Sequence, residues 1–253
     1  MSLQVVKEQM KKLLLPTAAS ELEEVLSRQK KAVSVGWLSE LLEKELDSRR
    51  ANSIAKRIKL AGFPEVTSLE SFDWEFNQKV KRERIEQLAT MKFVERNEIA
   101  LLLGSPGTGK THLGIALGVL AAHQGHRVYW TSVKRLAMKI QVAKERGSLD
   151  KLFKQILTSK LWVLDDWGVT SMSREIAEEV FDLLDRRKHS CALLLTSNRA
   201  VEEWPRVFPD PIIANAAIDR LFERAEVVFF KGDSYRLKGR IMCREVDSEE
   251  NGE

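Results

Sequence analysis

One glycine-rich segment of the chain has the residue types and spacing that bind phosphate. It fits G-x-x-x-x-G-K-[ST] at every fixed position and consists of Gly104, Ser105, Pro106, Gly107, Thr108, Gly109, Lys110 and Thr111, followed by His112. The glycines let backbone N–H groups surround phosphate oxygens, and the next helix N-terminus adds partial positive charge. Lys110 would reach the β- and γ-phosphates, and the Thr111 hydroxyl would ligate Mg²⁺. The alternative is a glycine-rich turn without a ligand, but the flanking apolar strand and helix favour binding of a nucleoside triphosphate such as ATP.

Two adjacent carboxylates follow another apolar segment. Residues 161–164 (Leu-Trp-Val-Leu) lead directly into Asp165 and Asp166. This is the Walker B arrangement, in which Asp165 would hold Mg²⁺, because Mg²⁺ binds few carboxylates and keeps much of its hydration. Asp166 is placed to act as general base on the attacking water. The alternative is that both aspartates only cap the turn before Gly168.

Polar residues also follow two later strand candidates. Asn198 ends the segment 196–198 (Thr-Ser-Asn), where its amide could bond the γ-phosphate or the attacking water. In the alternative, Asn198 or Ser197 caps a turn. Residues 232–236 (Gly-Asp-Ser-Tyr-Arg) end on Arg236, which could reach the nucleotide in cis.

A pair of arginines lies on a helix expected to start near Pro211. Arg220 and Arg224 are four residues apart, so on one helix they would share a face. An arginine supplied in trans can neutralise charge during phosphoryl transfer. Taken alone, the pattern favours a solvated ion-pair face with Asp219 and Glu223.

The chain after residue 98 alternates strand candidates with helical segments. The predicted strands are Ile99–Leu103, Arg127–Thr131, Leu161–Asp165, Ala192–Ser197 and Val227–Phe230. This alternation predicts an α/β fold with a parallel sheet sandwiched by helices. Such folds bind ligands at the carboxyl ends of their strands, so we expect the polar motifs to form one shared site.

The domain pattern changes twice along the chain. Residues 1–68 contain helical patterns only and predict a small helical domain that docks a partner or DNA. Residues 69–243 form the predicted ATPase domain, which opens with a connecting stretch and a basic helix over 78–93. The acidic segment 244–253 is expected to be a flexible tail.

Two helices are expected within the N-terminal domain. Thr17 or Ser20 would cap the first. The second would begin near Ser34 and end at residues 62–64 (Gly-Phe-Pro). Its polar side carries a basic patch that includes Arg49 and Arg50.

Composition narrows the function classes. A net charge of +4 over 253 residues suits a polyanionic partner without requiring one. Cys191 and Cys243 lack metal-type spacing and are expected to be reduced core residues, as in the cytosol. No apolar run reaches membrane-spanning length, so we expect a cytoplasmic protein without a membrane partner.

The order of these motifs resembles that in the initiator branch of the AAA+ ATPases. Within this branch the chain is similar to the IstB-like helper ATPases of bacterial insertion sequences, to which the DnaC helicase loader is related. The resemblance covers residues 13–238 and rests on the phosphate loop, Asp165-Asp166, Thr196-Ser197-Asn198, Asp219-Arg220-Leu221 and Gly232-Asp233-Ser234-Tyr235-Arg236. Very many proteins share the phosphate loop, whereas its combination with the Ser-Tyr-Arg ending is far more selective.

The resemblance implies a role for each matching residue. Lys110 and Thr111 match the nucleotide and Mg²⁺ contacts, Asp165 the metal carboxylate, Asp166 the catalytic acid position, Asn198 the first sensor, Arg236 the second sensor, Arg220 the arginine finger and Arg224 its companion. Two departures stand out. Most AAA+ proteins have Glu in place of Asp166, so we expect slow hydrolysis. Only 17 residues follow Arg236, too few for the usual helical lid domain.

Contact with DNA is implied by the same resemblance. In the initiator branch, an extra helix between the second and third strands follows a nucleic-acid backbone. The matching segment carries Lys134, Arg135, Lys139 and Lys144, which would neutralise phosphates of duplex DNA independently of sequence. The alternative is an ordinary solvated helix face. The patch at Arg49 and Arg50 is a second candidate, either for DNA or for a protein partner.

The function implied is that of an ATP-dependent homo-oligomer on duplex DNA that recruits and stimulates a transposase. A DnaC-type helicase loader has the same motor and a different client. A small-molecule kinase is the distant alternative, and it predicts a monomer that ignores DNA.

Overall fold

The computed structural model describes residues 2–28 and 34–238 and divides the chain into two compact units, Met1–Lys56 and Arg57–Glu253. The larger unit contains the whole sheet. The boundary between the units lies earlier than the domain boundary expected at residue 68. Cys243 and the acidic segment 244–253 lie outside the described residues, whereas Cys191 is a buried free thiol.

The sheet of the larger unit has five parallel strands in the order β2-β3-β4-β1-β5. They are β1 (Ile99–Gly104), β2 (Val128–Ser132), β3 (Leu161–Asp165), β4 (Ala192–Ser197) and β5 (Ala225–Phe230). The strands are almost continuously apolar because helices cover both faces of the sheet. The predicted α/β fold is confirmed, and each predicted strand differs from the observed one by at most two residues at an end.

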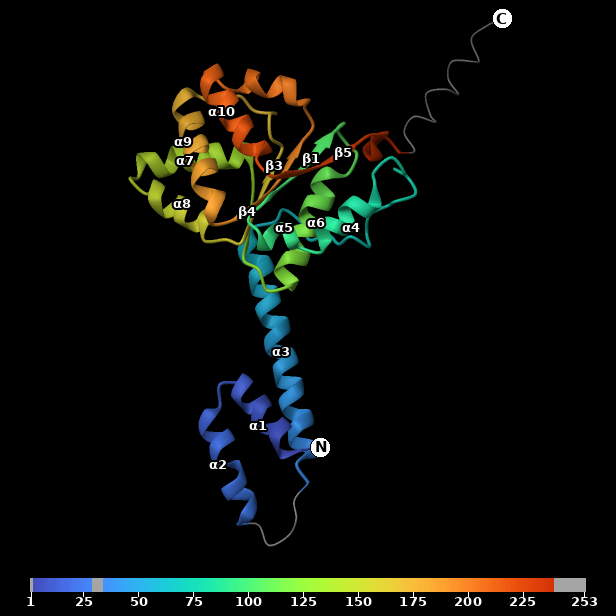
Figure 1. Cartoon of the computed structure of the whole chain (residues 1–253), viewed down its shortest axis with the longest axis vertical. Coiled ribbons are helices and arrows are strands. Elements are labelled where there is room, and N and C mark those ends of the chain that lie inside the picture. Colours follow the sequence, from blue (N-terminus) through green and yellow to red (C-terminus); the bar gives the residue numbers. More distant parts are fainter. Residues whose placement is uncertain (1, 29–33, 239–253) are drawn as a thin grey trace, which may run out of the picture. The chain divides into compact units, whose positions relative to one another are not determined.

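The two faces of the sheet bury separate sets of side chains, because successive residues of a strand point in opposite directions. Ile99, Leu101 and Leu103 pack in one core cluster, and Ala100 and Leu102 pack in the other. The first face is covered by α7 (Val133–Glu145), α8 (Leu149–Leu157), α9 (Arg174–Arg186) and α10 (Pro211–Phe222) (Figure 1). The second is covered by α4 (Arg82–Ala89), α5 (Lys92–Glu95) and α6 (Lys110–His123).

The smaller unit is helical, with α1 (Leu3–Lys12), α2 (Pro16–Ser27) and most of α3 (Gly36–Ala61). Its own core cluster includes Val6, Met10, Leu22 and Leu42. The cap predicted at Thr17 or Ser20 is wrong, because α2 begins at Pro16. Proline suits a first helical position, where its missing N–H is not needed.

Two helix ends are set by left-handed backbone. α3 ends at Ala61, and Gly62 follows with φ 79°, so the stop predicted at residues 62–64 is confirmed. The single helix predicted over 78–93 is instead divided into α4 and α5, because Met91 between them has φ 59°. A methionine in this conformation is unusual and gives no signal in the sequence.

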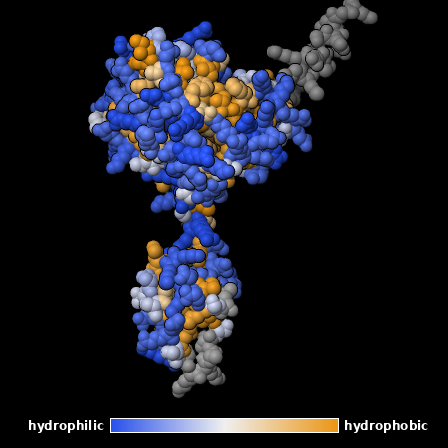
Figure 2. All heavy atoms as spheres, viewed as in Figure 1, coloured by the Kyte–Doolittle hydropathy of each residue, from blue (hydrophilic) through white to orange (hydrophobic). Residues whose placement is uncertain are grey.

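The surface of the larger unit is mostly hydrophilic on the face shown in Figure 2, with a continuous hydrophobic area near its upper edge. The smaller unit exposes several large apolar side chains, among them Leu14, Trp37 and Leu41. Within the described residues, no helix is both long enough and apolar enough to cross a membrane.

Candidate functional site

The phosphate loop lies at the carboxyl edge of the sheet, between β1 and α6. β4 lies beside β1 and β3 lies beside β4, so Asp165 and Asn198, which end or follow these strands, are at the same edge. Ligands of open parallel sheets bind at this edge. This strand order therefore brings the residues of the expected shared site to one edge of the sheet.

The glycines of the loop have backbone conformations in which any other residue would be strained. Gly104 has φ 141°, and a Cβ built on it would lie 1.9 Å from the carbonyl oxygen of Phe230. Gly107 has φ 74°, and its Cβ would lie 2.0 Å from Ser234 Oγ. The Tyr235 N–H donates to the Gly107 carbonyl over 2.9 Å. The segment after β5 therefore packs directly on the phosphate loop, and only glycine permits this approach.

Lys110 is buried inside this loop, with 6% of its surface exposed. Its Nζ donates to the Ser105 carbonyl over 2.6 Å. Burial lowers the pKa of Lys110 to about 8, an effect that the charges of Asp166 and Asp165 oppose and that of Arg236 reinforces. An anion beside Nζ would offset the cost of burying this ammonium. A phosphate group fits that requirement.

Asp165 forms the second part of the site. Its Oδ1 accepts hydrogen bonds from Thr111 Oγ1 at 2.9 Å and from Thr196 Oγ1 at 2.6 Å. Burial raises the pKa of Asp165, and these two hydroxyls partly oppose the increase. The nearby oxygen donors of Asp165 and Thr111 suit Mg²⁺, which takes few protein carboxylates and completes its shell with water and phosphate. No cluster of three or more His, Cys, Asp or Glu side chains that could hold a metal ion occurs among the described residues.

Asp166 adopts a left-handed backbone conformation, with φ 60°. Its N–H donates to Thr196 Oγ1 over 3.1 Å, and its side chain is exposed beside the phosphate loop. Among residues other than glycine, Asp and Asn adopt this conformation most readily. The backbone therefore gives a physical reason for Asp where most AAA+ proteins have Glu.

At the end of β4, Ser197 and Asn198 have different surroundings, which distinguishes turn capping from a predicted contact with phosphate. Ser197 Oγ donates to the Trp167 carbonyl over 2.7 Å and accepts from Trp204 Nε1 and from the Arg199 N–H, each at 3.2 Å. Ser197 is therefore a structural residue of the turn. Asn198 is exposed at the carboxyl edge, and its side chain makes no hydrogen bond with another described residue. Its assignment as a phosphate sensor stays a prediction.

An aromatic pocket adjoins the phosphate loop. It is lined by Ser71, Phe72, Asp73, Phe76, Asn77, Gly107, Thr108, Gly109, His112 and Tyr235. The rings of Phe76 and Tyr235 meet edge to face at 5.0 Å, and Ser71 Oγ lies 3.0 Å from His112 Nε2. Sequence reasoning selected His112 but missed the aromatic residues. The signal for two of them was the spacing of Phe72 and Phe76, which lie four residues apart in the connecting stretch that precedes the ATPase strands.

Arg236 lies on a short 3-10 helix, η3 (Tyr235–Leu237), which follows the contact between Tyr235 and Gly107. Its side chain is exposed, and its charge lowers the pKa of Lys110. Arg236 therefore lies at the same edge of the sheet as the phosphate loop of its own chain.

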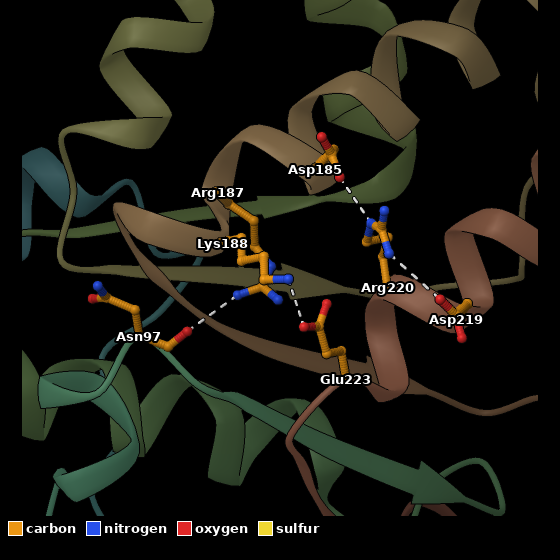
Figure 3. Close-up of polar contacts among 7 residues, drawn as sticks. All are labelled: Asn97, Asp185, Arg187, Lys188, Asp219, Arg220 and Glu223. Carbon is orange, nitrogen blue, oxygen red and sulfur yellow. Dashed lines mark hydrogen bonds and ion pairs between the residues drawn. The ribbon is translucent and has the colours of Figure 1, made fainter.

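Arg220 lies at the opposite edge of the sheet. It belongs to the last turn of α10, shortly before β5 begins at Ala225. Its Nε donates to Asp185 Oδ1 over 2.8 Å, and its Nη1 lies 3.4 Å from Asp219 Oδ2 (Figure 3). Because β5 runs parallel to β1, the start of β5 is remote from the loop that follows β1. Arg220 therefore cannot reach the nucleotide of its own chain in this conformation.

Arg224 does not share a helix face with Arg220, so that prediction is wrong. α10 ends at Phe222, and Arg224 has left-handed backbone with φ 55°. The neighbouring Glu223 is 2.6 Å from Lys188 and does not pair with Arg220 (Figure 3). Four-residue spacing brings side chains together only where the helix continues.

The four basic residues predicted on the α7 segment have different surroundings. Lys139 Nζ is 2.7 Å from the Tyr129 hydroxyl, and Lys144 forms an ion pair with Glu179 at 3.0 Å. Lys134 and Arg135 are exposed and form no ion pair with a described residue.

Arg49 and Arg50, the two residues named from the basic patch, are already paired with carboxylates of their own helix. Arg49 lies 2.7 Å from Glu45, and Arg50 lies 3.5 Å from Asp47. Arg49 also donates to the Leu13 carbonyl over 3.0 Å.

The family model described as IstB-like ATP binding protein matches residues 8–243. An ATP-binding protein of insertion sequence IS21 from Pseudomonas aeruginosa is 39% identical over 202 residues, which cover 80% of this chain and 76% of that protein. An ATP-binding protein of insertion sequence IS5376 from Geobacillus stearothermophilus is 31% identical over 214 residues and covers 85% of each chain.

Solved structures support the fold. AMPPCP-bound DnaA from Aquifex aeolicus has a TM-score of 0.55 at 22% identity, and the match covers 75% of this chain but only 57% of DnaA. DnaI has a TM-score of 0.57 at 18% identity and covers 65% of this chain and 91% of DnaI. The parallel sheet with its flanking helices is thus of the AAA+ type.

Proposed function

The chain belongs to the IstB-like ATP-binding proteins, and from this membership we propose that it is a Mg²⁺-dependent ATPase that assembles on duplex DNA and stimulates a transposase. The main support is the separation of Arg220 from the phosphate loop across one sheet. A site completed only by a neighbouring copy couples nucleotide binding to assembly.

The proposed reaction is hydrolysis of ATP at the carboxyl edge of the sheet. Lys110 binds the β- and γ-phosphates, and Thr111 and Asp165 would hold Mg²⁺, which neutralises phosphate charge when bound. Asp166 accepts a proton from water as the water oxygen bonds to the γ-phosphorus. The bond from the γ-phosphorus to the bridging oxygen breaks, leaving ADP and phosphate. The exposed carboxylate of Asp166 beside the loop supports this role.

The aromatic pocket beside the loop would hold the nucleoside part of ATP. Phe72, Phe76 and Tyr235 provide flat apolar surfaces for a base, while Asn77 and His112 supply polar edges. Since η3 packs on the loop through Tyr235, binding at the pocket would also position Arg236.

DNA contact in this proposal depends on Lys134 and Arg135. Both are exposed at the start of α7 and have no carboxylate partner among the described residues, whereas Lys144 is neutralised by Glu179. Neutralising two phosphates contributes about 1.8 to the slope of log affinity against log salt. The double change to alanine should therefore reduce this slope by about 2, and an unaltered slope would exclude these contacts.

The identity of the partner protein distinguishes the proposed transposase helper from a helicase loader. Relatives from insertion sequences favour a transposase, whereas the fold shared with DnaI also suits a helicase loader. A pull-down should compare an insertion-sequence transposase with a replicative helicase, both taken from the same host. Retention of the transposase alone supports the proposal, and retention of the helicase alone supports the alternative.

The direct test of the motor is the ATP turnover rate, measured with and without duplex DNA. Particle size is measured in ATP and in ADP. Turnover stimulated by DNA and larger particles in ATP are expected. A monomer that transfers phosphate to a metabolite and ignores DNA would refute the proposal in favour of a kinase.

A further inference from the structure

The outer edge of β5 is open. β5 pairs with β1 on one side and is the last strand of the sheet. On its other side, no backbone hydrogen bond to another part of residues 2–28 or 34–238 is present. Alternate residues of an edge strand direct their N–H and C=O groups outward, where another strand can pair with them.

A groove of about 500 Å³ lies beside this edge. Val227, Val228 and Phe229 form its strand side. The segment leading into α4 forms the facing side, and α4 and β5 lie on the same side of the larger unit (Figure 1). Phe229 is 60% exposed, which is high for an aromatic ring on a sheet edge. The groove thus offers main-chain hydrogen bonds and an apolar contact together.

Four cations surround the groove, and they are Lys79, Lys81, Arg84 and Lys231. All four are exposed, and none forms an ion pair with a described residue. Many other basic residues of the chain do form such pairs, for example Arg82 with Glu86 at 2.8 Å. Arg84 lies near the Glu226 carboxylate of β5, where burial raises the pKa and the charge of Arg84 lowers it, whereas the three lysines have no such partner among the described residues. The groove therefore keeps a net positive charge, and the complementary ligand is acidic.

We propose that this groove binds an extended acidic peptide segment of a partner protein, which pairs with β5 as a sixth strand. Its carboxylates would lie against the four cations, and an apolar side chain would cover Phe229. A nucleic-acid backbone fits less well, because phosphates only accept hydrogen bonds and would leave the outward C=O groups of β5 unpaired. This binding site is additional to the nucleotide, DNA and transposase functions proposed above.

The test uses a fluorescein-labelled ten-residue peptide of alternating Glu and Val, bound to the full chain and followed by fluorescence anisotropy. Changing Lys79→Glu together with Lys81→Glu should weaken binding about tenfold, because two exposed attractions become repulsions. The matched control is Lys92→Glu with Lys154→Glu, which alters two exposed lysines outside the groove and should leave binding unchanged. Phe229→Ala should also weaken binding without changing charge.

Strand pairing is tested on the peptide itself. N-methylation of alternate residues removes the N–H donors from one edge of a strand. Methylation of one edge should abolish binding, and methylation of the other edge should have little effect. Equal binding of both methylated peptides would overturn the proposal. So would equal affinity of the unmethylated peptide for the Lys79/Lys81 variant and for the Lys92/Lys154 control.

Two other occupants give distinct results. Single-stranded DNA is tested as a competitor of the peptide. If it displaces the peptide, if changing Lys79 and Lys81 weakens its binding, and if both methylated peptides still bind, then the groove is a nucleic-acid surface and the proposal fails. If a chain ending at residue 244 binds the peptide at least tenfold more tightly, the acidic segment 245–253 is the occupant, and a partner protein is excluded.

Discussion

Asp185 and Arg220 provide the most specific prediction about assembly. In the proposed oligomer, Arg220 contacts a nucleotide held by a neighbouring copy, but in the single chain it is bound to Asp185 over 2.8 Å (Figure 3). The carboxylate must release the guanidinium before assembly is complete. Changing Asp185→Asn should therefore favour the assembled state.

The size of the shift toward the assembled state depends on how exposed the ion pair between Arg220 and Asp185 is. The Arg220 and Asp185 side chains are 37% and 52% exposed, so solvent screens their attraction. Exposed pairs of this kind shift an equilibrium by at most about fivefold. The protein concentration that gives half-maximal ATP turnover should fall by about two- to fivefold in Asp185→Asn. Turnover at saturating protein should stay the same, because the site itself is not altered.

The assay is ATP turnover as a function of protein concentration with duplex DNA in excess. Asp182→Asn is the matched control, because Asp182 lies on the same helix and pairs with Arg186 at 2.8 Å. Its half-maximal concentration should equal that of the wild type. If Asp185→Asn and Asp182→Asn both behave like the wild type, Arg220 does not have to leave Asp185, and the reasoning is refuted.

Three further predictions concern the nucleotide site. Because the pKa of Lys110 is about 8 without nucleotide, bound phosphate should raise it, so calorimetry should detect proton uptake on ATP binding at pH 8.5 and almost none at pH 6.5. Lys110→Arg should abolish that uptake, and uptake that persists would contradict the assignment. Asp166→Asn should bind ATP and hold DNA in a filter assay but lose at least about 100-fold in turnover; near-normal turnover would exclude the general base. Gly107→Ala should abolish ATP binding in the same calorimeter, whereas Gly125→Ala, also with positive φ but in open space, should retain it.

The sheet was predictable from the sequence because parallel strands are buried on both faces. Residues 161–165 and 192–197 are continuous apolar runs that end on polar residues, and their predicted bounds agree with β3 and β4. The phosphate loop was predictable for a different reason, since at Gly104 and Gly107 a positive φ coincides with neighbouring atoms that a Cβ would meet. Its position after β1 then placed the site at the carboxyl edge.

Other features depend on tertiary contacts that no local pattern encodes. The end of α10 at Phe222 separates Arg224 from Arg220, although their spacing suggested one face. Thr196 bonds both Asp165 and the Asp166 backbone, a role that becomes visible only once β3 and β4 are adjacent. The aromatic pocket joins residues 71–77 to Tyr235 across most of the chain. In each case, long-range packing decides what the side chain contacts.

The central claim is that each ATP site takes Arg220 from a neighbouring copy. Two inactive variants, Asp166→Asn and Arg220→Ala, are mixed in equal amounts with ATP and duplex DNA, and turnover is measured. Random mixing gives about a quarter of the sites an intact Asp166 and an intact neighbouring Arg220, so about a quarter of the wild-type rate should return. A mixture no more active than either variant alone would contradict the account.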